Sequence, residues 1–250
     1  MDADLKKTLR NNLIIAVVIA SVAIGYMAYK RRDTGVPPKK VQETYSANMD
    51  DYVTPKKIFP YNVESAKKEI AGKTIWVKAG NIIPYYAYEA TSHSANFKKK
   101  LGVLPPLAKL QIKDVIVQKE PVTVKEGQVS VVQKDIMAVF EIDGKTGTFA
   151  APFGTNSGDD YNFTANDSFF FEDPHVLYKH WPADVWSSVD QHQAKVGMNE
   201  LQASFALGAS LNSDGTEYGN RTVEYTNAGN PVTVVFEKNK ATSVTPGKAP

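Results

Sequence analysis

The side chains that could carry out chemistry are concentrated between residues 159 and 192, where histidines and acidic residues gather. His175, His180 and His192 lie within 18 residues, and together with Asp190 they could form a His/Asp metal site. Zinc ligands usually come with tight, regular spacing, and no two histidines of this chain are four residues apart. The spacing therefore favours the simpler interpretation, in which these residues are polar groups around the start of a helix.

The same region carries five acidic side chains that could act as paired carboxylates or calcium ligands: Asp159, Asp160, Asp167, Glu172 and Asp173. Calcium loops of the EF-hand type place ligands at every second position around a central glycine, a spacing that these residues lack. The sequence contains no serine elbow, phosphate-binding glycine loop or dinucleotide fingerprint. We therefore predict that the protein is not an enzyme, with no catalytic, cofactor-binding or metal-binding residues and no small-molecule substrate.

The N-terminal segment contains 17 consecutive residues without a formal charge, from Leu13 to Tyr29. A helix of this length lies at the short end of what spans the hydrocarbon core of a bilayer. Tyrosines favour the membrane interface, and the basic residues that follow can reach lipid headgroups. We predict that residues 1–29 form a tail and a single-pass transmembrane helix, anchored by Leu13, Ile14, Ile15, Val17, Val18, Ile19, Val22, Ile24, Tyr26, Tyr29, Lys30, Arg31 and Arg32.

A cleaved signal peptide is the main alternative to a permanent anchor. Lys6, Lys7 and Arg10 would form its basic region, and Ser21-Val22-Ala23 has the small residues that a peptidase accepts. The apolar run continues past this site and ends at basic residues, so an uncleaved anchor is favoured. Three Lys/Arg residues precede the helix and five follow it, which by the positive-inside rule places the body in the cytoplasm.

Composition excludes several classes of site and partner. The chain has no cysteine, which rules out disulfides, thiolate metal sites and a lipidated N-terminal cysteine. Residues 30–140 hold 19 Lys/Arg and 11 Asp/Glu, whereas residues 141–220 hold 3 and 12. The basic half could be attracted to anionic lipid headgroups, or both halves could be ordinary solvated surfaces. No arginine-rich run is present, so nucleic-acid binding is not expected.

The region after the anchor is predicted to form a linker and then a small β domain. Residues 30–60 are rich in proline and polar residues, which suits an extended linker. Residues 61–152 contain about five short strand patterns, which are typical of a small β-barrel or sandwich. In architecture and strand spacing this region resembles bacterial Src-homology-3-like barrels.

Several local features of this β region make specific predictions. Thr74–Val77 reads as a strand, and the alternation from Leu110 to Val117 slips at Lys113-Asp114, as a bulge would produce. Pro84 cannot donate to a ladder, so the aromatic strand that contains it is expected at a sheet edge. Asp143-Gly144 predicts a two-residue hairpin.

Residues 153–180 are predicted to be a connector rich in Gly, Asn and Asp. Three consecutive phenylalanines in it could form a docking surface, although a hydrophobic seam between two domains is the favoured interpretation. We expect exposed aromatic side chains of the β domain and of this connector to be the contacts with partner proteins: Tyr85, Tyr86, Phe169, Phe170 and Phe171.

Residues 181–250 are predicted to form two helices followed by a meander of three strands. Pro182 is suited to the start of the first helix, Asn199 to the N-cap of the second, and Gly208 to its C-cap. Alternating apolar residues after Arg221 and after Val232 indicate strands, and a third strand is expected at residues 241–244.

The residues of this C-terminal region carry a resemblance. Trp186 with Val189, then Gly197-Met198, Leu201-Gln202, Leu207-Gly208 and Tyr225 before a hairpin ending at residues 236–240, resemble the SmpA/OmlA (BamE-like) family. The resemblance covers about residues 182–245. It implies the same order of helices and strands, a place in the bacterial envelope and a role in the assembly of other membrane proteins.

Together these features predict an α+β protein with a transmembrane helix, a small β-barrel or sandwich and a BamE-like α-α-β-β-β domain. The expected function is that of a non-catalytic accessory or scaffold subunit that stabilises a larger membrane complex, such as a respiratory or photosynthetic one. Its expected partners are the lipid bilayer and other subunits of that complex. The alternative is a periplasmic factor for envelope or outer-membrane-protein assembly. The expected location is the bacterial inner membrane, and the resemblance favours a periplasmic over a cytoplasmic body.

Overall fold

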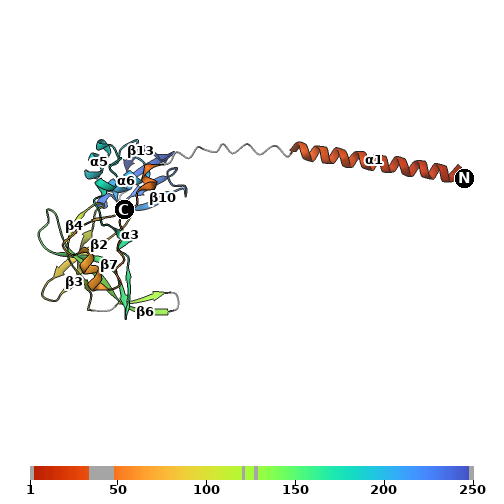
Figure 1. Cartoon of the computed structure of the whole chain (residues 1–250). Helices are drawn as coiled ribbons and strands as arrows, with labels where there is room; N and C mark the ends of the chain where they lie inside the picture. The colour runs from red at the N-terminus through yellow and green to blue at the C-terminus, as the bar shows by residue number, and fades with distance from the viewer. Residues whose placement is uncertain (1–2, 34–47, 120–121, 127–128, 248–250) are drawn as a thin grey trace. The chain divides into compact units, whose positions relative to one another are not determined.

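A computed structural model describes residues 3–33, 48–119, 122–126 and 129–247 of the chain (Figure 1). The chain divides into two compact units, residues 1–48 and residues 49–250. Most of the predicted linker, residues 34–47, lies outside the described residues.

The first unit contains one long helix, α1 (Ala3–Asp33). Within it, Asn12–Lys30 is long and apolar enough to cross a membrane. Its large apolar side chains from Leu13 to Tyr29 are all exposed, by between 54% and 67%. A core helix of a soluble protein would bury such a surface. The predicted apolar helix is therefore confirmed, and its insertion in a bilayer as an uncleaved anchor stays a prediction.

The second unit is built around a sheet of nine antiparallel strands in the order β3-β2-β7-β6-β4-β1-β9, with β5 paired to β6 and β8 paired to β7. The strands are β1 (Thr74–Val77), β2 (Pro84–Glu89), β3 (Ser94–Val103), β4 (Lys109–Val117), β5 (Val122–Glu126), β6 (Val129–Ile142), β7 (Phe149–Ser157), β8 (Asp160–Phe163) and β9 (Phe169–Phe170).

The sheet is not the closed barrel that the strand spacing predicted. Among the described strands, β3 lies at one end of the sheet and pairs with β2. On its other side it contacts the side chain of Gln118, which follows β4, and not another strand. The buried amide of Gln118 accepts a hydrogen bond from the Ala95 N–H at 3.2 Å and donates one to the Ala95 carbonyl at 3.1 Å. An amide side chain presents the same donor and acceptor as a backbone peptide. Gln118 thereby satisfies the backbone N–H and carbonyl of one residue of β3, and the sheet stays open at this edge.

Local predictions in this sheet had mixed outcomes. Thr74–Val77 is a strand, and the register between β4 and β6 shifts between Ile112 and Asp114, which confirms the predicted bulge. The strand containing Pro84 is not at an edge, because β2 lies between β3 and β7. Pro84 is tolerated as the first residue of β2, before the pairing with β7 begins at Tyr86.

The hairpin predicted at Asp143-Gly144 is longer than two residues. Strand β6 ends at Ile142 and β7 begins at Phe149, so six residues connect them. The register pairs Phe140 with Phe149, and both rings lie in the core. Burial of these two rings fixes the register, so the turn signal alone did not set the loop length.

Two segments predicted as linker and connector belong to the folded body. A 3₁₀ turn, η1 (Met49–Tyr52), begins the second unit, and Ile58 is buried in the core before helix α2 (Val63–Ile70). In residues 153–180, β7 continues to Ser157 and β8 and β9 join the sheet. The short helices α3 (Ala165–Ser168) and α4 (Pro174–Leu177) flank β9.

The C-terminal part contains the two predicted helices, α5 (Ala183–Asp190) and α6 (Glu200–Leu207). Asn199 caps α6 by accepting a hydrogen bond from the Gln202 N–H, and Gln202 accepts one from the Asn199 N–H. Gly208 ends α6 with φ of 89°, a conformation that favours glycine. Both predicted helix boundaries are confirmed.

A sheet with the consecutive strand order β10-β11-β12-β13 follows these helices. It contains four strands instead of the predicted three: β10 (Ser210–Asp214), β11 (Thr222–Tyr225), β12 (Val232–Glu237) and β13 (Lys240–Pro246), with the turn η2 (Asn227–Gly229) before β12. Every residue of β10 is exposed, so β10 has no alternation of apolar residues to signal a strand.

Two core clusters meet at consecutive residues of β9. Phe169 belongs to the cluster inside the nine-stranded sheet, and Phe170 belongs to the cluster of α5, α6 and the C-terminal sheet. Because successive side chains of a strand point to opposite faces, one short strand supplies a ring to each core. Phe169 and Phe170 therefore lie where two core clusters of one compact unit meet, and the seam between two separate domains stays a prediction.

Candidate functional site

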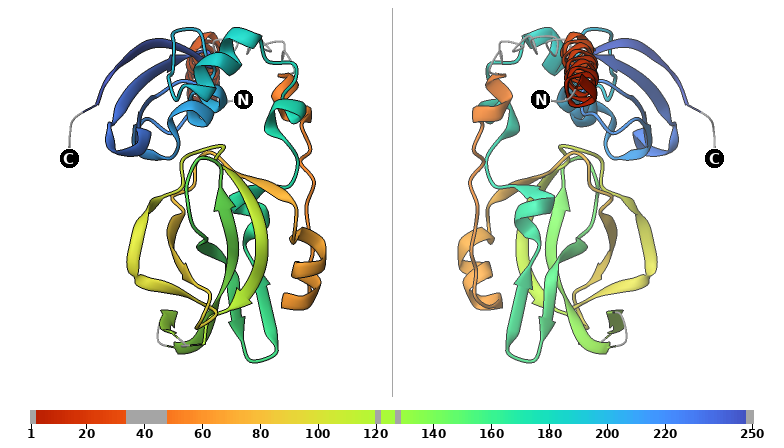
Figure 2. Two further views of the ribbon diagram at one scale, coloured as in Figure 1. Left: turned by 90° about the vertical axis from the view of Figure 1, so that its left-hand side faces the viewer. Right: turned by 90° about the vertical axis from the view of Figure 1, so that its right-hand side faces the viewer.

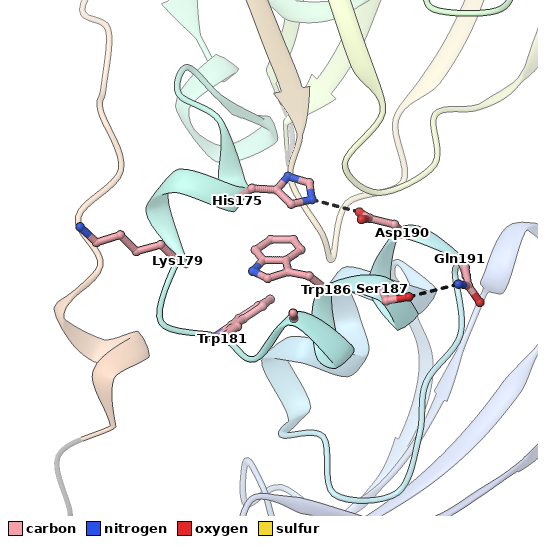
Figure 3. A pocket seen from close by; sticks show the side chains of 8 residues that line it. His175, Lys179, Trp181, Trp186, Ser187, Asp190 and Gln191 are labelled. Atoms are coloured by element: carbon pink, nitrogen blue, oxygen red, sulfur yellow. Dashed lines mark hydrogen bonds and ion pairs between the residues drawn. The ribbon is translucent and has the colours of Figure 1, made fainter.

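The residues of the His/Asp site that the sequence disfavoured are only partly brought together. His175 Nδ1 lies 3.1 Å from Asp173 Oδ1, and its Nε2 lies 3.1 Å from Asp190 Oδ1. The imidazole stacks on Trp186 with 4.0 Å between ring centroids, and Trp181 follows at 5.0 Å from Trp186. Figure 3 shows the three rings in sequence along an open pocket of about 550 Å³.

The other two histidines face different partners. His180 contacts Asp50, and His192 Nδ1 lies 3.2 Å from the Ala206 carbonyl oxygen. Across the described residues, no three His, Cys, Asp or Glu side chains are grouped as metal ligands would be. The structure therefore joins His175 to Asp190 and separates both from His180 and His192.

Ser187 lines the same pocket, which raises the question of a Ser-His-Asp arrangement. Its hydroxyl accepts a hydrogen bond from Gln191 Nε2 at 3.2 Å (Figure 3). A serine nucleophile needs a neighbouring base with a free ring nitrogen, and both nitrogens of His175 contact carboxylates. This geometry favours a role for His175 in joining α4 to α5 over a role in proton transfer.

A buried carboxylate fixes the start of the second unit. Asp50 Oδ1 lies 2.6 Å from His180 Nε2 and accepts a hydrogen bond of 2.6 Å from Trp181 Nε1, while Oδ2 accepts one of 2.8 Å from Asn199. Burial alone raises the pKa of Asp50, but these hydrogen bonds together lower it below its ordinary value. Asp50 thus ties η1 to the chain before α5 and to the N-cap of α6.

The aromatic residues predicted as exposed partner contacts are largely inside the protein. Tyr85 is 6% exposed, Phe169 1% and Phe170 4%. Tyr86 and Phe171 are partly buried against core clusters. The expected exposure of these rings is therefore corrected: they lie on strands, or next to one, that turn an aromatic face into the core.

The most exposed aromatic side chains of the second unit lie instead at the boundary between the predicted linker, which ends at residue 60, and the predicted β domain. Phe59 and Tyr61 are each 78% exposed. Lys57, two positions before Phe59, is exposed as well, whereas Ile58 between Lys57 and Phe59 is buried. Residues 56–61, here called the strap, thus have an inward and an outward side. The alternation of apolar and polar residues could have indicated a half-buried extended segment. The neighbouring prolines favoured a linker instead.

An apolar groove of about 550 Å³ lies between the two sheets of the second unit. One wall comes from Ile82, Leu101 and Val103 at the ends of β2 and β3, and the other from Leu211 of β10 and Pro231. Tyr85 also lines it. A groove of this size and composition is typical of binding sites, and large apolar side chains exposed at its rim mark protein contacts.

Three exposed lysines, Lys98, Lys99 and Lys100, immediately precede Leu101 on β3. Lys100 pairs with Tyr86, but the next pair joins Ala87 to Asn96, so residues 97–99 bulge out of the ladder. Of the ion pairs among described residues, none involves these three ammonium groups. The three lysines therefore precede a groove residue, Leu101, on the same strand, although none of them lines the groove itself.

Comparison of the chain with protein-family models, with curated proteins and with solved structures found no match.

Proposed function

We propose that the protein is a membrane-anchored accessory subunit, which holds its body at a bilayer surface and stabilises a larger membrane complex through protein–protein contacts. The observation that carries this proposal is an apolar helix whose large side chains are all more than half exposed, joined in one chain to a body with an apolar groove. Helix α1 supplies the anchor, and the groove supplies the contact with another subunit.

The chemistry of the groove defines the partner segment that it would accept. Leu101, Val103 and Leu211 offer apolar contact area. The exposed lysines 98–100 precede Leu101 on β3 and add positive charge to that strand. Complementarity requires a segment with apolar side chains next to acidic ones. The partner is therefore a subunit with such a segment close to the membrane surface.

The order of α5, α6 and antiparallel strands supports a second candidate function. Gly197-Met198 precedes the capping box of α6, and Gly208 ends that helix, at the positions that carry the SmpA/OmlA resemblance. On this alternative the chain is an envelope-assembly factor with a periplasmic body. It rests on similarity of element order, which is a weaker basis than a site.

Purification of the full-length chain from membranes in mild detergent tests the proposal. We expect a stoichiometric complex with other membrane subunits. Recovery with outer-membrane assembly machinery would support the second candidate, and recovery of the intact chain from the soluble fraction alone would contradict both. Protease accessibility in spheroplasts would determine the side of the membrane on which the body lies.

A further inference from the structure

We infer that the strap, residues 56–61, is a second membrane contact that docks the body onto an anionic bilayer surface. The inference rests on the proposed anchoring by α1 and adds to it a defined face of the body. The docking side chains are Lys56, Lys57, Phe59 and Tyr61, which are all exposed.

The strap has the composition of a membrane interface. Aromatic rings favour the boundary between headgroups and hydrocarbon. Lysines beside them attract anionic headgroups, and their flexible stems let the ammonium groups stay in water. Lys57, Phe59 and Tyr61 alternate with inward-facing positions, so they share one side of an extended segment. The two rings and the Lys57 ammonium therefore face the same surroundings. Lys56 has the parity of Ile58 but is exposed, and its flexible stem lets its ammonium reach the same surface.

The backbone of the strap is held rigidly, so this exposed side is a preformed surface. Ile58 is buried, and both of its backbone polar groups are bonded to the amide of Asn166. The Lys56 N–H donates to Glu172 Oε2 at 2.9 Å, and the Tyr61 N–H donates to Ser65 Oγ at 2.9 Å. A preformed surface loses little conformational entropy when it docks.

The intramolecular contacts of the strap do not explain why its side chains are aromatic and basic. Among the ion pairs of the described residues, neither Lys56 nor Lys57 has a carboxylate partner. Two aromatic rings exposed by 78% are costly in water unless something covers them. An anionic bilayer satisfies both the charge and the rings.

The position of the strap in the chain favours a membrane over a soluble protein partner. Only 22 residues lie between the end of α1 at Asp33 and Lys56. A chain of that length spans at most about 80 Å, so the tether keeps the strap at a high local concentration near any membrane that holds α1. Figure 2 shows β3 on the opposite side of the nine-stranded sheet from the strap, so docking through the strap leaves the lysines of β3 free for a partner.

The test uses the full chain inserted by α1 into lipid nanodiscs that contain spin-labelled headgroups, which quench a nearby fluorophore. The chain has no cysteine, so a dye can be placed at one introduced cysteine. Thr54→Cys places it beside the strap, and Lys99→Cys places it on β3. Each position is measured in phosphatidylcholine alone and with phosphatidylglycerol added.

We expect strong quenching at position 54 in anionic nanodiscs, weaker quenching in zwitterionic ones, and little quenching at position 99. Each lysine near an anionic surface changes the ratio of docked to undocked body by about fivefold. The double variant Lys56→Glu/Lys57→Glu is therefore expected to lower that ratio by about 25-fold or more. The matched control Lys238→Glu/Lys240→Glu makes the same charge change on the C-terminal sheet and is expected to leave quenching unchanged. Phe59→Ala/Tyr61→Ala is expected to weaken docking in both lipids.

Equal quenching in the two lipids, or no effect of Lys56→Glu/Lys57→Glu, would overturn the inference. Stronger quenching at position 99 than at position 54 would assign the membrane contact to β3 and overturn it as well. Failure of the chain to co-elute with nanodiscs is a separate result, because it would contradict the anchor itself and, with it, the docking.

Discussion

The side-chain amide of Asn166 forms hydrogen bonds with both backbone polar groups of Ile58, at 2.9 Å from the Ile58 N–H and 2.7 Å to its carbonyl. The two residues are 108 positions apart in the chain. Gln118 bonds Ala95 in the same way at another margin of the sheet. In both places an amide side chain substitutes for a neighbouring strand.

Asn166→Ala is expected to destabilise the protein by about 1–3 kcal/mol, because it leaves two backbone groups of the strap without a protein partner. The free energy of unfolding in urea measures this cost. Asn212→Ala, at an exposed position of β10, is the control and is expected to cost less than about 0.5 kcal/mol. Equal costs for the two variants would show that Asn166 does not hold the strap.

Arg221→Ala is expected to cost about 3–5 kcal/mol, because it leaves a buried carboxylate without its counter-ion. Glu200 Oε1 accepts hydrogen bonds from Arg221 Nη2 at 2.6 Å and Nε at 3.0 Å, and its Oε2 accepts one from the Gly219 N–H. The Lys113–Glu141 pair is half-exposed and provides the contrast. Lys113→Ala is expected to cost at most about 1 kcal/mol, and a cost for Arg221→Ala within that range would contradict the assignment.

Asp50→Ala is expected to lose stability in a pH-dependent manner. Hydrogen bonds lower the pKa of Asp50 in the folded state, despite its burial. A carboxyl group whose pKa is lower in the folded than in the unfolded state stabilises the folded protein. This contribution is complete above the unfolded-state pKa, ~3.9 for aspartate, and is lost as the pH falls through the folded-state pKa. The difference in unfolding free energy between wild type and variant should therefore be constant near pH 7 and shrink below about pH 4. A difference that stays constant down to pH 2 would contradict this explanation.

Leu101→Asp and Leu211→Asp are expected to reduce the yield of partner subunits that co-purify with the chain. Each places a carboxylate on one wall of the apolar groove, where an acidic, apolar partner segment would be repelled. Both side chains are about half-exposed, so the variants should keep their thermal unfolding temperature. Val196→Asp, at an exposed position that does not line the groove, is the matched control. Unchanged co-purification for both groove variants would remove the groove as the contact.

Features set by local chemistry could be predicted from the sequence. The capping box at Asn199 and the left-handed Gly208 depend only on residues nearby, and so does the bulge between Ile112 and Asp114. The apolar helix over residues 13–29 follows from composition alone. Each of these signals lies within a single helix or a single strand.

Features set by distant contacts could not be predicted. Pro60 in the strap and Pro55 before it suggested a linker. The contact that holds the strap could not be seen, because its partner Asn166 lies more than 100 residues away. Tyr85 and Phe169 looked like docking residues, because one sequence does not show which face of a strand is buried. The sheet is open because the free edge of β3 bonds the Gln118 side chain instead of another strand. This contact forms only in the folded sheet, so the sequence did not reveal it.

The central claim is that residues 13–29 stay in the membrane as part of the mature chain. N-terminal sequencing of the protein recovered from carbonate-washed membranes tests it most directly. The account predicts an intact N-terminal region that includes Leu13 through Tyr29. A mature protein that begins at Ile24 and is recovered from the soluble fraction would contradict it.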